Sequence, residues 1–130
     1  MQQQLDTIIM SICEKDPRYS EDAYQFVLES LSYTQKKFKR PKHVAGKELL
    51  EGIKDLLMEQ FGPMTIPVLK HWGIKGTEDF GHIVFNLLEN KVLSKTDEDN
   101  INDFKNVYDF KVVFDQGYRH KLNRKISRLR

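Results

Sequence analysis

Cysteine and long hydrophobic runs are scarce in this chain. Cys13 is the only cysteine among 130 residues, so no disulfide can form within the chain, and we expect a cytoplasmic protein. The apolar runs are only a few residues long, which predicts no integral membrane association. The polar start of the sequence lacks the pattern of a secretory signal. Because Cys13 falls on an apolar helical face, we expect it to fill space in the core rather than to react.

Catalytic, nucleotide-binding and metal-binding motifs are absent as well. The sequence has no GxxxxGK[ST] or GxGxxG loop for phosphates, no HExxH and no paired cysteines. His71 and His82 lack a third ligand for a metal, and the acidic residues 97–103 lack the glycine of a calcium loop. We therefore expect no enzymatic activity, no cofactor and no metal, although a site built from distant carboxylates would leave no readable motif.

The charge is unevenly distributed along the chain. The net charge is +2, with 21 Lys and Arg against 19 Asp and Glu. Six of these cations and no acid lie in residues 119–130, so the first 118 residues carry 15 cations against the same 19 acids. A chain of this length supports one domain. We therefore predict a globular domain over residues 1–118 and a basic tail over residues 119–130.

Hydrophobic residues at helical spacing predict five helices. Ser20 is expected to cap the second helix, and Gly62 with Pro63 to end the third. Gly52 and Gly81 lie inside helices, where glycine costs about 1 kcal/mol relative to alanine, so each predicts a close approach by a neighbouring helix. The predicted helices cover residues 5–15, 21–35, 46–61, 67–72 and 77–88.

We expect the chain to be organised around residues 61–88. Two helices are predicted there, joined by a tight turn in which Gly73 is left-handed and Thr77 caps the next helix. This is the general form of a helix-turn-helix, although the pattern alone favours an ordinary helical hairpin in a core. Glu78 and Asp79 would place carboxylates where a DNA-reading helix carries Arg, Lys, Asn or Gln, which argues against sequence reading.

After residue 90 the hydrophobic period changes to that of a strand. Residues 91–94 could pair with this strand in a two-stranded hairpin, which would make the C-terminal half winged-helix-like. A helix over residues 101–108 is the alternative, because its aromatic residues also fit a helical period. The fold class is therefore mainly α. The aromatic face of the predicted strand consists of Tyr108, Phe110, Val112 and Phe114.

Five segments carry a resemblance to a known family. They are GKELLEGI (46–53), FGPM (61–64), VLKHWGI (68–74), TEDFGHIVFNLL (77–88) and DFKNVYDF (103–110). In their order and spacing they resemble an uncharacterised family of short bacterial proteins. The likeness covers about residues 16–114 and leaves out the basic tail. It implies no activity, because that family has no assigned function.

Two basic segments provide the candidate binding residues. In the tail, Leu122, Ile126 and Leu129 recur between the cations at helical spacing, which predicts a basic amphipathic helix that orders on phosphate. The second cluster, near the end of the second helix, also has a structural explanation, because cations there are favourable in themselves. The candidate residues are Arg119, Lys121, Arg124, Lys125, Arg128 and Arg130 in the tail, and Lys36, Lys37, Lys39, Arg40 and Lys42 in the second cluster.

The sequence therefore predicts a small non-enzymatic binding protein that associates with nucleic acid or the ribosome. The alternative is a protein–protein adaptor with an acidic body and a basic docking tail, in which the tail could also fold back onto the body. A role at a membrane surface is the least favoured, because the tail has only three apolar residues.

Overall fold

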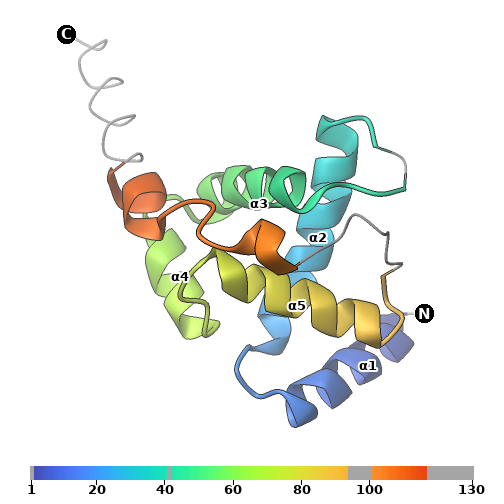
Figure 1. Cartoon of the computed structure of the whole chain (residues 1–130). Helices are drawn as coiled ribbons and strands as arrows, with labels where there is room; N and C mark the ends of the chain where they lie inside the picture. Colours follow the sequence, from blue (N-terminus) through green and yellow to red (C-terminus); the bar gives the residue numbers. More distant parts are fainter. Residues whose placement is uncertain (1, 41, 94–100, 117–130) are drawn as a thin grey trace, which may run out of the picture.

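A computed structural model describes residues 2–40, 42–93 and 101–116 of the chain (Figure 1). Over these ranges the protein is mainly helical, and the five predicted helices are confirmed with small shifts of their ends. Three short helices accompany them. The order is α1 (Gln2–Lys15), α2 (Glu21–Lys37), α3 (Gly46–Phe61), η1 (Gly62–Met64), α4 (Thr65–His71), α5 (Thr77–Glu89), η2 (Ile101–Phe104) and η3 (Lys111–Gln116).

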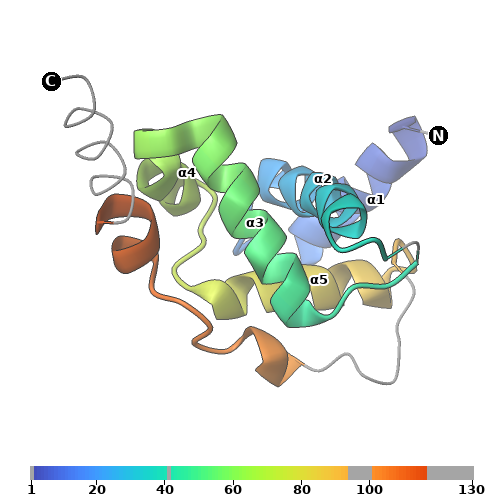
Figure 2. The ribbon, with the colours of Figure 1, turned by 90° about the horizontal axis from the view of Figure 1, so that it is seen from above.

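The helices enclose one hydrophobic core. α2 packs against α3, and α5 lies across the pair, with α1 against α2 (Figure 2). Every long helix contributes residues to the core, and η2 and η3 add one phenylalanine each. No helix within the described ranges is long and apolar enough to cross a membrane. The largest fully buried side chains include Tyr24, Leu50, Ile53, Leu57, Phe80 and Ile83.

Local signals explain where the helices start, with one correction. The hydroxyl of Ser20 accepts a hydrogen bond from Ala23 N–H, as a capping serine should. The prediction that Thr77 caps α5 is wrong, because Gly76 occupies the cap position and Asp79 accepts its N–H. The hydroxyl of Thr77 instead donates to the carbonyl of Phe104 at 2.6 Å and accepts the N–H of Val107 at 3.1 Å.

The interior glycines are sites of close approach. At Gly52 of α3, a Cβ atom would overlap the hydroxyl of Thr34 on α2, which confirms the predicted approach of two helices. At Gly81 of α5, a Cβ would come within 2.8 Å of Phe104 Cβ, and at Gly46 of α3 within 3.0 Å of Phe104 Cε2. At Gly81 the neighbour is therefore one aromatic side chain from η2, and not a long helix.

The predicted β-hairpin is wrong. Residues 107–114 form no strand, and no strand occurs anywhere in the described part of the chain, so a winged-helix-like half is not formed there. Phe110 directly precedes η3 and Phe114 lies within it, and their rings are 5.7 Å apart. Val112, which the strand would have buried with them, is 55% exposed. The alternative of a helix over residues 101–108 is right only for residues 101–104, which form η2. α4 and α5 form the expected helical pair across Gly73.

The Gly73 turn should tolerate no side chain. Gly73 has φ +84°, and a Cβ there would overlap the carbonyl oxygen of Arg18 in the α1–α2 loop. We expect Gly73→Ser to lower the free energy of unfolding by about 2 kcal/mol or more, measured by chemical denaturation. Gly76→Ser is the matched control, because its φ is −160° and its Cβ would meet nothing within 4 Å. Equal losses in both variants would contradict the steric explanation.

Candidate functional site

The predicted basic cluster of residues 36–42 forms the turn between α2 and α3, here called the basic turn. α2 ends at Lys37, and Phe38 N–H donates to Thr34 O at 3.0 Å. Lys39 then takes a left-handed conformation with φ 54°, which reverses the chain direction. Lys36 and Lys37 lie in the last turn of α2, where cations favour the helix dipole. The structural explanation therefore holds for part of the cluster.

The five cations of the basic turn divide into two groups. Lys37 pairs with Asp55 of α3, and Arg40 Nε lies 3.4 Å from Glu48 Oε2 at the start of α3. These two pairs hold the turn against α3. The other three, Lys36, Lys39 and Lys42, are exposed, and none pairs with a carboxylate of the described residues.

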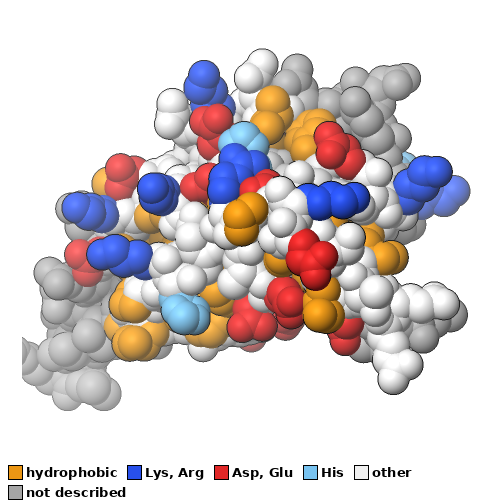
Figure 3. Space-filling model, turned by 90° about the horizontal axis from the view of Figure 1, so that it is seen from below, with side chains coloured by type: hydrophobic (Ala, Val, Ile, Leu, Met, Phe, Trp, Pro, Cys, Tyr) orange, Lys and Arg blue, Asp and Glu red, His pale blue; other side chains and the backbone are white. Residues whose placement is uncertain are grey.

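The six tail candidates, Arg119 to Arg130, lie outside the described residues. The last described element, η3, contacts α4 and η1, beside the C-terminal end of α3. The basic turn lies at the N-terminal end of α3, so it and η3 lie at opposite ends of this helix (Figures 1 and 2). Because α3 has sixteen residues, its two ends are about 24 Å apart. In Figure 3, cationic and acidic side chains are interspersed over the face seen from below.

A partly buried polar network joins the α1–α2 loop to α5. Asp16 Oδ2 accepts from Arg18 Nη2 at 2.7 Å and from Asn86 Nδ2 at 2.9 Å. Asn86 Nδ2 also donates to the hydroxyl oxygen of Tyr24 at 2.8 Å. The hydrogen bonds from Arg18 hold the pKa of Asp16 well below its usual range, so this carboxyl is a structural acceptor and a poor proton donor.

A second carboxylate is similarly engaged beside the Gly73 turn. The hydroxyl of Tyr19 donates to Asp79 Oδ1 at 2.5 Å, and Asp79 Oδ2 accepts from Lys75 N–H at 2.7 Å. Burial is the main reason that the pKa of Tyr19 lies above its usual value. Both oxygens of Asp79 thus stabilise the turn before α5. The absence of enzymatic activity stays a prediction.

The remaining candidate side chains also make ordinary contacts. His82 Nε2 lies 3.7 Å from Glu78 Oε1 one helical turn away, and His71 is exposed on α4. No group of three potential metal ligands occurs within the described ranges. Cys13 is half-buried, its thiol faces the carbonyl of Tyr19 at 3.6 Å, and burial raises its pKa. A raised thiol pKa disfavours the reactive thiolate at neutral pH, in keeping with a space-filling role.

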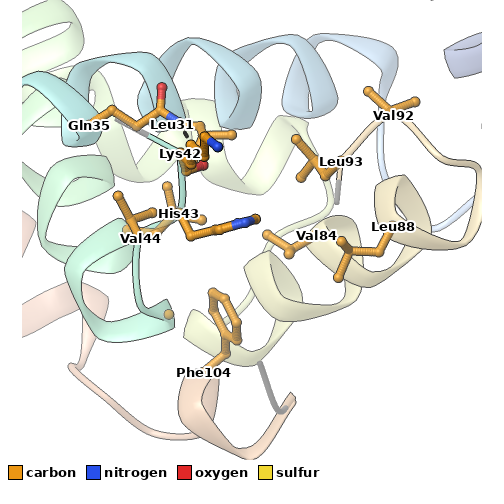
Figure 4. Close-up of a pocket in the computed structure, with 12 residues that line it drawn as sticks. Leu31, Gln35, Lys42, His43, Val44, Val84, Leu88, Val92, Leu93 and Phe104 are labelled. Carbon is orange, nitrogen blue, oxygen red and sulfur yellow. Dashed lines mark hydrogen bonds between the residues drawn. The ribbon is translucent and has the colours of Figure 1, made fainter. Parts of the chain in front are cut away.

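The sequence did not predict a cavity of about 370 Å³ beside the basic turn (Figure 4). Its mouth carries the polar side chains of Gln35, Lys42 and His43. The only feature of the sequence that relates to this cavity is that apolar residues continue past the end of α5. Hydrophobic periodicity cannot show that these residues lie opposite residues 42–44. The apolar wall comprises Leu49, Val84, Leu88, Val92, Leu93 and Phe104, from α3, α5, the segment after α5 and η2.

Asp16 should contribute stability that depends on pH. Because its folded pKa is depressed, the contribution is present above the unfolded pKa of about 4 and is lost as the pH falls towards the lower folded value. We expect Asp16→Asn to cost about 1 kcal/mol at pH 7, and the cost to shrink as the pH drops below about 4. Urea denaturation at several pH values measures this.

The control for Asp16→Asn is Glu14→Gln, which removes an exposed carboxylate at the end of α1. We expect its free energy of unfolding to stay within about 0.5 kcal/mol of the parent at each pH. A cost of Asp16→Asn that does not change between pH 7 and pH 3 would refute the ionic role of Asp16.

The protein was also compared with known proteins. No family model matches the sequence, and no significant match was found among curated proteins or solved structures.

Proposed function

We propose that this is a non-enzymatic protein that binds nucleic acid, alone or within the ribosome, through phosphate contacts. The contacts are assigned to Lys36, Lys39 and Lys42 of the basic turn and to the six cations of the tail. The observation that supports this most is that only some cations of the basic turn are paired with carboxylates of α3. Lys37 and Arg40 hold it against α3, and three exposed ammonium groups remain within seven residues.

Phosphate contacts supply affinity and little sequence preference. The helical pair α4–α5 gives no reason to expect sequence-specific recognition. Glu78 is exposed at the start of α5, and Asp79 is occupied by the capping bonds described above. A phosphate backbone would be repelled there, so we assign no DNA-reading role to α5.

A protein–protein adaptor is the second candidate, and a separate observation favours it. An open apolar groove is lined by Phe61, Pro67, Val68 and Trp72, with Asp22 at its edge. The rings of Phe61 and Trp72 are 5.7 Å apart. Aromatic side chains of this kind are frequent anchors in protein interfaces. The groove lies mainly on α4, a helix that also contacts η3.

The salt dependence of RNA binding tests the proposal. Each phosphate contact on single-stranded RNA contributes about 0.7 to the slope of log K against log salt. We expect the triple change Lys36→Gln, Lys39→Gln and Lys42→Gln in the full chain to reduce the magnitude of the slope by about 2. Replacing the six tail cations with glutamine should reduce it by about 4. Fluorescence anisotropy with a labelled mixed-sequence RNA measures both.

The matched control is the triple change Lys47→Gln, Lys70→Gln and Lys75→Gln, which removes three exposed lysines outside the basic turn. Its slope should stay close to that of the parent. If the control loses as much as the basic-turn variant, binding is a property of overall charge and the assignment fails. If the parent binds no RNA or DNA at physiological salt, the adaptor function is favoured, and cross-linking should then be used to find its protein partner.

A further inference from the structure

The cavity beside the basic turn combines an apolar wall with a cationic mouth. In Figure 4 the imidazole of His43 extends from the turn towards Val84 and Leu93, and Lys42 lies near Leu31 and Gln35. Gln35 Nε2 donates to the carbonyl of Lys42 at 3.2 Å, which fixes the backbone at the mouth. The volume of about 370 Å³ lies in the range of small-molecule sites.

Among the described residues that line the cavity, the charged side chains are of one sign. None of its described lining residues is Asp or Glu, and Lys42 and His43 are the only ones that can carry charge. The opposite wall, formed by Val84, Leu88 and Leu93, offers no hydrogen-bonding side chain. A ligand that satisfies both sides needs an apolar body and an anionic head.

We propose that this cavity binds a small aliphatic carboxylate, with the chain against Val84, Leu88 and Leu93 and the carboxylate at Lys42 and His43. An uncharged chain would leave Lys42 without a counterion, and an amine of the same length would be repelled. A carboxylate without a chain would leave the apolar wall facing water. Both parts of the ligand are therefore needed for binding.

This inference does not depend on the proposed nucleic-acid function, although Lys42 belongs to both sites. The ligand experiment contains no nucleic acid, so each proposal can fail while the other holds. Where both hold, the ligand carboxylate occupies Lys42 and should compete with the phosphate contact at that residue.

Four probes separate the contributions of chain and charge in isothermal titration calorimetry with the full chain. Octanoate has both features, 1-octanol has only the chain, octylammonium has the chain with opposite charge, and acetate has only the carboxylate. We expect octanoate to bind about tenfold more tightly than octanol, which is the lower end of what a hydrogen bond to a charged group contributes. Octylammonium and acetate should bind more weakly still.

Two pairs of variants locate the site. Lys42→Gln should weaken octanoate binding about fivefold, whereas Lys36→Gln, on the same turn but outside the cavity, should not. Leu88→Trp should fill the cavity and abolish binding, whereas Leu28→Trp changes another half-buried leucine that does not line it. Circular dichroism checks that each variant folds.

Amide chemical shifts of the parent protein provide a test that needs no variant. Octanoate should shift the amides of His43, Val84 and Leu93 and leave Ile66 and Val68 of α4 unchanged. The proposal is overturned by any of three results: no octanoate binding at millimolar concentration, equal affinity for octanol and octanoate, or shifts confined to residues outside the cavity.

Discussion

The structure depends on one steric constraint, the fit of the Phe104 ring against two glycines. Gly46 begins α3 and Gly81 lies inside α5, and a Cβ on either would crowd the ring. An interior glycine costs about 1 kcal/mol, whereas burying a phenylalanine contributes about 1.5–3 kcal/mol, and two hydrogen bonds through Thr77 add to it. The free energy gained by burying Phe104 therefore exceeds the cost of the glycine. In this position Phe104 forms one wall of the cavity, and the chain continues from it to η3.

Much of the fold is local in origin and could be predicted from the sequence. Apolar periodicity, Ser20 and the Gly62–Met64 break give the five helices, because each depends on residues within a few positions. The failures are long-range. Thr77 was expected to cap its own helix, but it bonds to a residue 27 positions away. The aromatic spacing of residues 108–114 fits both a strand and a helix. In the structure residues 111–116 form the π-helix η3, in which Phe114 packs against Tyr108, and Phe110 before it packs against Phe80.

In the candidate site too, the local features could be predicted from the sequence and the long-range contacts could not. The cations of the basic turn are evident in the sequence, but their roles are not. Lys37 and Arg40 pair with carboxylates 18 and 8 positions away, while Lys36 and Lys39 beside them pair with no carboxylate in the described part of the chain. The cavity could not be predicted, because its lining comes from segments that only the tertiary fold brings together. These are α2, α3, α5, the segment after α5, η2 and the basic turn with the residues that follow it. The tail cations remain a prediction from sequence alone.

Nuclear Overhauser effects in the whole chain can test whether Phe104 docks against the two glycines. We predict contacts from the Phe104 ring protons to the Hα protons of both Gly46 and Gly81, with those protons shifted upfield by the ring current. Finding these contacts would establish the docking that shapes the cavity and the C-terminal segment. Phe104 resonances at random-coil positions, with no contact to either glycine, would contradict it.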